Sequence, residues 1–143
     1  MDFHGKVALV TGGGSGIGRS TCEIFSERGG AVVIADVNET SAKATAEAIR
    51  EKGGRAQAIR CDVSRWDQVE EAVNTARRSF GRLDVVINCA GILRISPLEE
   101  TSEKDWNEVL QVNLTGAFLV TKAAFRAMRE QGGGSIVHIA SRM

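Results

Sequence analysis

The sequence of 143 residues has the length of one ordinary domain and leaves too few residues for a second. Apolar residues make up 43% of it and charged residues 25%, which excludes a disordered or low-complexity chain and predicts a buried core. Eighteen Lys and Arg balance eighteen Asp and Glu, so the chain has no excess of the positive charge that binds nucleic acids and anionic membranes. We therefore expect neither of these among its partners.

Cysteine content and the N-terminus indicate the compartment. The chain has three widely spaced cysteines, Cys22, Cys61 and Cys89. Neither a zinc site nor a disulfide framework has this pattern, so we expect no metal and small buried thiols in a reducing environment. No basic segment followed by an apolar one opens the sequence, and the longest uncharged run, 109–121, is shorter than the roughly 20 apolar residues of a membrane span. The sequence predicts a cytoplasmic protein.

Short β-branched runs alternate with longer stretches of helical period. Strands are predicted at residues 7–11, 31–36, 55–60, 85–88 and 135–139. Because parallel strands joined by helices cross over right-handed, we expect an α/β, Rossmann-like doubly wound parallel sheet.

A glycine-rich segment, Thr11 to Gly18, separates the first predicted strand from the first helix. Glycines let the backbone turn sharply and let a pyrophosphate approach amides at a helix N-terminus. The spacing Gly-x-x-x-Gly-x-Gly is met by Gly12, Gly16 and Gly18, whereas Gly-x-Gly-x-x-Gly fits nowhere. We predict a phosphate-binding turn; a tight turn that binds nothing is the alternative.

Asp36 ends the second predicted strand, eighteen residues after Gly18. A carboxylate at this place accepts hydrogen bonds from the hydroxyls of an adenosine ribose. A 2'-phosphate would meet like charge there, and neither Ser15 nor Val37 is a cation that could offset it. The sequence therefore predicts NAD over NADP. Alternatively, Asp36 merely caps the next helix.

Helix boundaries follow from local signals. Gly53 and Gly54 are expected to end the helix before the third strand. Ser64, with Asp67 three residues on, is the predicted cap of the next helix. That helix has one apolar face, formed by Val69, Ala72, Val73, Ala76 and Phe80. Ser102 and Asp105 repeat the capping pattern.

Asn113 shares a helical stripe with apolar residues, namely Trp106, Leu110, Ala117 and Val120. We therefore expect a buried amide, and a buried amide needs a hydrogen-bond partner. A core amide satisfied by backbone is one reading, and a functional amide is the other. By itself, Ser141 after the fifth predicted strand reads as a turn residue.

The glycine turn and Asp36, with Asn88-Cys89-Ala90-Gly91, Asn113 and Ser141, resemble the short-chain dehydrogenase/reductase family over the whole chain. Family members transfer a hydride between a nicotinamide and an alcohol or carbonyl. The resemblance implies diphosphate binding by Gly12, Ser15, Gly16, Ile17 and Gly18. It implies contacts of Asp36 with the adenine ribose and of Asp62 and Val63 with adenine.

On the nicotinamide side, the resemblance places Asn88, Cys89, Ala90 and Gly91 beneath the ribose. Relatives often carry a second asparagine where this chain has Cys89. Cysteine cannot make the contact of an asparagine amide, so only backbone contacts are expected there. The family role of Asn113 is to hold a water of a proton relay, and that of Ser141 is to donate a hydrogen bond to the substrate oxygen.

In the family a tyrosine, assisted by a lysine four residues later, transfers the proton, yet this sequence contains no tyrosine. We therefore expect residues 1–143 to be a single, C-terminally incomplete dinucleotide-binding domain. Its sheet would be truncated after the fifth strand, and it would be inactive alone.

The parent enzyme would act on a small alcohol or ketone and form a dimer or tetramer through the helix 106–130. The loop 92–98 is mostly apolar, which hints at a hydrophobic substrate wall but equally suits loop anchoring. The alternative function is a non-catalytic NAD-binding module.

Overall fold

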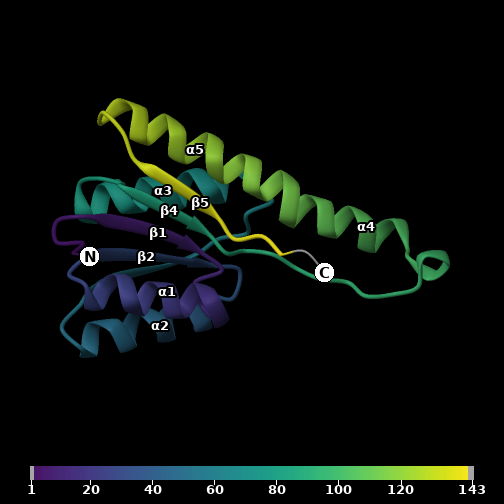
Figure 1. The fold of residues 1–143 in the computed structure, drawn as a ribbon, viewed down its shortest axis with the longest axis horizontal. Helices are drawn as coiled ribbons and strands as arrows, with labels where there is room; N and C mark the ends of the chain where they lie inside the picture. The colour runs from purple at the N-terminus through teal and green to yellow at the C-terminus, as the bar shows by residue number, and fades with distance from the viewer. Residues whose placement is uncertain (1, 142–143) are drawn as a thin grey trace.

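Five parallel strands form one sheet in the computed structural model, which describes residues 2–141 (Figure 1). The strands are β1 (Val7–Thr11), β2 (Ala31–Asp36), β3 (Arg55–Arg60), β4 (Val85–Asn88) and β5 (Ser135–His138). Their order across the sheet is β3-β2-β1-β4-β5, so the chain winds outward in both directions from β1. This arrangement confirms the predicted α/β doubly wound class.

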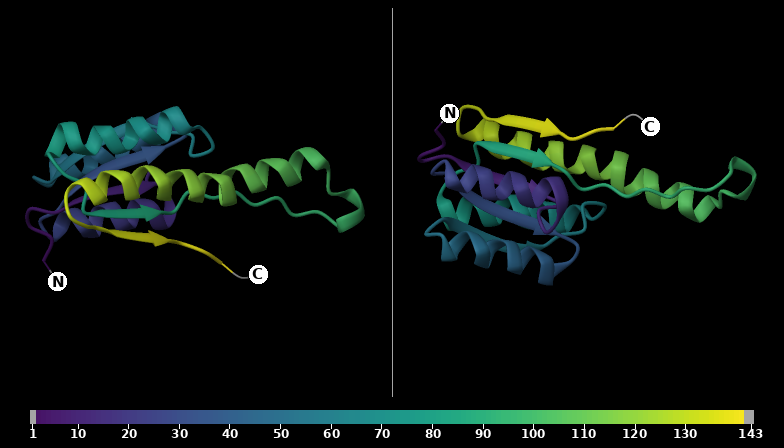
Figure 2. Two further views of the ribbon diagram at one scale, coloured as in Figure 1. Left: turned by 90° about the horizontal axis from the view of Figure 1, so that it is seen from above. Right: turned by 60° about the horizontal axis from the view of Figure 1, so that its bottom comes forward.

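Helices cover both faces of the sheet (Figure 1). Helices α1 (Gly16–Glu27) and α2 (Glu39–Glu51) lie on one face, and α3 (Trp66–Phe80) and α5 (Gly116–Glu130) on the other. Helix α4 (Glu103–Leu110) continues into α5 through a π-helical turn, Gln111–Thr115. Both views of Figure 2 show α4 extending well beyond the sheet as a projecting arm.

The core has two parts because side chains of a strand alternate between faces. Val7, Leu9 and Val33 pack against α3 and α5, while Ala8, Val10 and related positions pack against α1 and α2. Strands β1 and β2 are buried throughout except at Asp36, as expected for parallel strands covered on both faces.

Most predicted boundaries are confirmed, and one cap is wrong. Helix α2 ends at Glu51, and Gly53 turns left-handed with φ +83°. The Ser102 hydroxyl accepts from the Asp105 amide at 3.0 Å, as predicted. Ser64 does not cap α3, because its hydroxyl instead donates to the Asp62 carboxylate at 2.7 Å and Arg65 precedes the first turn.

Two predicted elements differ in extent. Strand β5 ends at His138, one residue earlier than expected, although the Ile139 amide still donates to the Asn88 carbonyl at 3.0 Å. The helix predicted through 106–130 begins at Glu103, directly after the predicted cap Ser102, and it is two α-helices joined by the π-helical turn rather than one.

Candidate functional site

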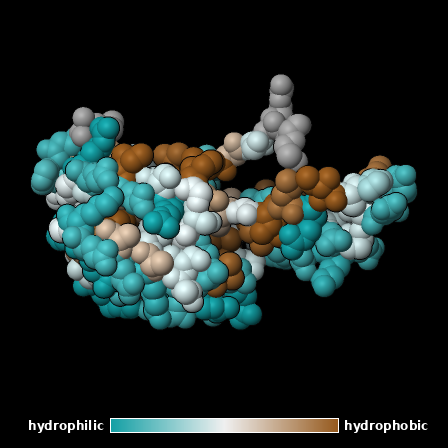
Figure 3. Space-filling model, turned by 90° about the horizontal axis from the view of Figure 1, so that it is seen from below, coloured by the Kyte–Doolittle hydropathy of each residue, from teal (hydrophilic) through white to brown (hydrophobic). Residues whose placement is uncertain are grey.

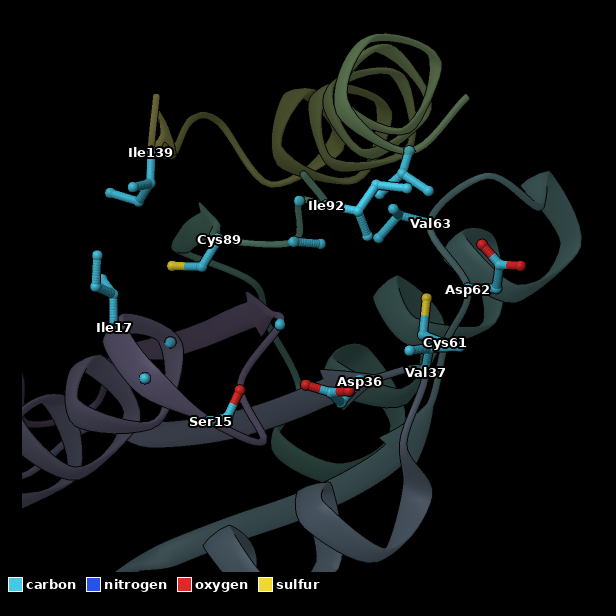
Figure 4. Close-up of a pocket in the computed structure, with 16 residues that line it drawn as sticks. Ser15, Ile17, Asp36, Val37, Cys61, Asp62, Val63, Cys89, Ile92 and Ile139 are labelled. Carbon is cyan, nitrogen blue, oxygen red and sulfur yellow. The ribbon is translucent and has the colours of Figure 1, made fainter. Parts of the chain in front are cut away.

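A cavity of about 500 Å³ lies at the carboxyl edge of the sheet (Figure 4). Its size is that of a small-molecule or cofactor site. The first residue after each of the five strands lines it: Gly12, Val37, Cys61, Cys89 and Ile139. This is the edge where open α/β sheets bind ligands.

All predicted coenzyme-binding residues except Asn88 line this one cavity. They are Gly12, Ser15, Gly16, Ile17, Gly18, Asp36, Asp62, Val63, Cys89, Ala90 and Gly91. The structure adds residues that were not predicted, namely Val37, Cys61, Ile92, Val112 and Ile139. Position directly after a strand could have identified three of them, whereas Val112 carries no such signal.

The glycine turn is tied to β2 by its own amides. Gly13 donates to the Ala35 carbonyl at 3.2 Å and Gly14 to the Asp36 carboxylate at 2.9 Å. A Cβ on Gly18 would lie 2.1 Å from the Gly12 carbonyl oxygen, closer than any real contact. Only glycine at position 18 therefore permits this turn.

The N-terminus of α1 faces the cavity through Gly16, Ile17 and Gly18. Helix geometry leaves the first amides of α1 without acceptors inside the helix, and the helix dipole adds partial positive charge. Gly16 has φ +51°, and a Cβ there would meet no atom within 4 Å, so it would project into open space. Such a cradle fits a diphosphate.

The Asp36 carboxylate is fixed in place by two backbone amides. One oxygen accepts from Gly14 and the other from Asn38, each at 2.9 Å. The alternative that Asp36 caps α2 is wrong, because Asn38 is the N-cap and accepts from the Ser41 amide at 3.1 Å. Asp36 thus lies beside the α1 N-terminus with its charge toward the cavity (Figure 4).

The cavity has two ends (Figure 4). At one end Val37, Cys61, Asp62 and Val63 lie together. Asp62 is held in its loop because its amide donates to the Gln68 side chain at 2.8 Å and its carboxylate accepts from Ser64. Burial raises the pKa of the Cys61 thiol to about 12, so this thiol is neutral.

At the other end Ile17, Cys89 and Ile139 surround an apolar space (Figure 4). Burial raises the pKa of the Cys89 thiol as well. Below this end, the buried Asn88 accepts from the Thr11 hydroxyl, which in turn accepts from the Ala90 amide at 3.2 Å. Asn88 therefore supports the lining loop from within the sheet.

Asn113 is exposed, so the prediction of a buried amide is wrong. The helix carries it past the end of the sheet, where α3 and the strands no longer cover it. Its side chain nonetheless has two partners, because it accepts from the Ile92 amide at 2.8 Å and donates to the Ile92 carbonyl at 2.9 Å. Asn113 lies within the π-helical turn, a feature common at functional sites.

Ser141 lies three residues beyond β5, exposed and outside regular structure. It does not line the cavity, whereas Ile139 on the same segment does. Between residues 2 and 141, no three His, Cys, Asp or Glu side chains cluster closely enough to hold a metal ion. Within that same span, no helix has the length and apolar character to cross a membrane.

Comparison with known proteins matches residues 6–143 to the model of a family described as short chain dehydrogenase. An uncharacterized oxidoreductase of Thermotoga maritima is 45% identical over 141 residues, which cover 99% of this chain and 55% of that protein. A D-threitol dehydrogenase of Mycolicibacterium smegmatis is 39% identical over 144 residues, covering 99% and 55%. The chain spans about half the length of these relatives.

Solved structures agree with the sequence match. A short-chain type dehydrogenase/reductase from Mycobacterium ulcerans superposes with a TM-score of 0.94 at 31% identity, over 99% of this chain and 53% of that one. The glycine turn, the acidic end of β2 and the cavity are thus found on a fold shared along the whole chain. The chain belongs to the short-chain dehydrogenase family.

Proposed function

We propose that this chain binds NAD and serves an oxidoreductase that interconverts a small alcohol and its ketone or aldehyde. The observation that most supports NAD is the Asp36 carboxylate, held by the Gly14 and Asn38 amides beside the N-terminus of α1. A 2'-phosphate brought to this place would face that negative charge. The family match supports the reaction class.

Each part of the cavity has a proposed task. Bound NAD supplies the hydride acceptor. Amides at the start of α1 bind the diphosphate, Asp36 accepts from the adenosine ribose, and Asp62 with Val63 borders the adenine. This orientation leaves the nicotinamide at the end formed by Cys89 and Ile139, on the side of the chain that leads to Ser141.

Two residues are proposed to serve the substrate side. Ser141 donates a hydrogen bond to the substrate oxygen. Asn113 holds the loop after β4 through both backbone groups of Ile92, and this fixes the loop beside the nicotinamide end. The proton-transferring tyrosine of the family has no counterpart among these 143 residues, which include no tyrosine.

The 143 residues by themselves are therefore expected to bind NAD without turning it over. Purified chain of verified mass should show no alcohol-dependent formation of NADH above a control without protein. Turnover above that control would contradict this expectation.

Calorimetry on the full-length protein that contains this chain tests the coenzyme assignment. We expect NAD to bind more tightly than NADP, and D36A to weaken NAD binding by about 10- to 100-fold, the effect of losing charged hydrogen bonds. D67A is the matched control, because Asp67 is an exposed aspartate at the start of α3. Tighter binding of NADP, or of neither coenzyme, would refute the proposal.

The second candidate is a non-catalytic NAD-binding module, which the same glycine turn and Asp36 carboxylate would serve equally. Turnover by the full-length protein distinguishes the two. For the enzyme we further propose a cytoplasmic homo-oligomer, dimer or tetramer, that pairs through the α4–α5 surface. That surface exposes Trp106, Phe118 and Phe125 at 60% each.

A further inference from the structure

The last residues of three neighbouring strands form a line of hydrogen-bonded side chains just below the cavity. Thr11 of β1 is in register with Asn88 of β4, and Asn88 with His138 of β5. The Asn88 side-chain nitrogen lies 3.3 Å from His138 Nδ1, and His138 Nε2 lies 3.0 Å from the Thr121 hydroxyl on α5. We call Thr11, Asn88, His138 and Thr121 the polar row.

The direction of the bonds at one end of the polar row follows from a backbone amide. The Ala90 N–H can only donate, so the Thr11 hydroxyl accepts from it and gives its own proton to the Asn88 carbonyl oxygen. Asn88 is then left with its NH₂ group toward His138, and Nδ1 of that ring must accept.

The other end of the row leads to the same assignment independently. The Thr121 hydroxyl donates to the Ala117 carbonyl at 2.8 Å, so it can only accept from His138 Nε2. His138 therefore carries its proton on Nε2 and has an unprotonated Nδ1. A second proton, on Nδ1, would set two donors against each other at Asn88.

The polar row lies directly before the residues that line the cavity, which suggests a role for the His138 ring. Directly after Thr11, Asn88 and His138 come Gly12, Cys89 and Ile139, all of which line the cavity. Besides the backbone bonds of the β4–β5 ladder, the His138 side chain connects β5 to Asn88 of β4 and to Thr121 of α5, three residues before Ser141. Small shifts of its strand would move Ser141 relative to the loop that contains Cys89.

We propose that His138, as the neutral Nε2–H tautomer, is a positioning residue that aligns the Ser141 segment with the nicotinamide end of the cavity. The predicted effect on turnover rests on the proposed oxidoreductase function, whereas the predicted tautomer of His138 is independent of that function. A two-part experiment on the full-length protein keeps these apart.

Nitrogen-15 NMR of the histidine rings tests the tautomer. His138 should show a protonated Nε2 and an unprotonated Nδ1 at neutral pH, with its signals assigned by their loss in H138Q. The opposite tautomer, or a doubly protonated ring, would overturn the assignment whether or not the protein has activity.

Kinetics test the positioning role. H138F removes both hydrogen bonds and should lower kcat by about tenfold or more, since small misplacements at a reacting centre are costly. The dissociation constant for NAD should change less than the turnover. H138N, whose carbonyl oxygen can accept from Asn88 in place of Nδ1, should recover most of the loss.

A threonine pair supplies the matched control. Thr121 and Thr45 each donate to the carbonyl four residues earlier, but Thr45 lies in α2 away from the polar row. T121V should lower kcat and T45V should not. Unchanged kcat in H138F, or equal losses in H138F and H138N, would overturn the positioning role.

Discussion

Strands β2 and β5 belong to one sheet, yet their surroundings differ sharply. Residues 31–35 of β2 are 0% exposed, whereas Val137 of β5 is 44% exposed and Ile139 just beyond it 45%. Helices pack on both faces of β2, and among the described residues only α5 packs on β5. Figure 3 shows apolar surface both on the body of the molecule and on the projecting arm.

The difference separates two tasks. The turn after β1 and the end of β2 make the proposed diphosphate and ribose contacts. Both follow strands that helices of this chain bury on both faces. The segment after β5, which carries Ser141, rests on a strand that is covered on one face. We expect coenzyme binding to be the more robust property of this chain and alignment of Ser141 the more fragile one.

The largest expected effect comes from a matched pair of valines. V33A empties a fully buried position and should lower the free energy of unfolding by about 2–3 kcal/mol. V137A should cost less than about 0.5 kcal/mol, because the side chain is already half exposed. Urea unfolding measures both, and equal losses would mean that β5 is as well packed as β2.

The next largest effect is expected from a matched pair of glycines in the turn between β1 and α1. G18A drives a Cβ into the Gly12 carbonyl, so the turn must open and NAD affinity should fall by about 10- to 100-fold. G16A meets no atom and costs about 1–2 kcal/mol of left-handed strain.

Calorimetry with NAD measures the loss of coenzyme affinity, and thermal melts measure the loss of stability from backbone strain. G16A should lower stability and, if the diphosphate lies where we propose, also obstruct binding. NAD affinity unaffected in both variants would exclude a diphosphate at this turn.

A smaller, pH-dependent effect is expected at the opposite edge of the sheet. Burial by itself would raise the pKa of Asp84, but hydrogen bonds from Arg82 and the Val7 amide, with the charges of Arg82 and Lys6, outweigh it and hold the pKa below its ordinary value of 3.8. A carboxyl with a lowered pKa contributes stability above the unfolded-state pKa and loses it as pH falls through the folded one.

D84N should therefore cost about 1 kcal/mol near neutral pH, after allowance for solvent at the half-exposed Arg82, and the cost should disappear as the pH falls through the lowered pKa of Asp84. Acid titrations of unfolding compare the variant with the parent. A cost that stays constant from pH 7 to pH 2 would contradict this account.

The smallest expected effect is the chemical reactivity of a thiol at the cavity end formed by Ile17, Cys89 and Ile139. Cys22 and Cys61 are buried, whereas Cys89 is partly exposed and lines the cavity. A thiol reagent should modify Cys89 slowly, since burial raises its pKa, and NAD should block the reaction. Mass spectrometry with C89S as the control identifies the site; modification unaffected by NAD would place the coenzyme elsewhere.

Local sequence signals predicted the strands because each strand is a short run between helical stretches, and all except β3 (RAQAIR) are rich in β-branched residues. Four strands have the predicted bounds, and β5 differs by one residue. The residues predicted to bind coenzyme share one cavity because strand ends converge at one edge of any parallel sheet, and strand ends can be read from the sequence.

The errors came where a contact that the pattern did not include, one local and one between distant segments, outweighed the predicted one. Ser64 has the spacing of an N-cap, yet its hydroxyl donates a hydrogen bond to the Asp62 carboxylate two residues away. Asn113 has apolar neighbours on its helix, yet the arm extends past the sheet and leaves it exposed with Ile92 as its partner.

The sequence alone thus determined the alternation of strands and helices, the glycine turn and the acidic end of β2, because each depends on residues adjacent in the chain. Only the tertiary structure decided the exposure of Asn113 and brought together Thr11, Asn88, His138 and Thr121. Strand register and helix placement bring those four side chains within hydrogen-bond distance, and neither can be predicted from the spacing of residues along the chain.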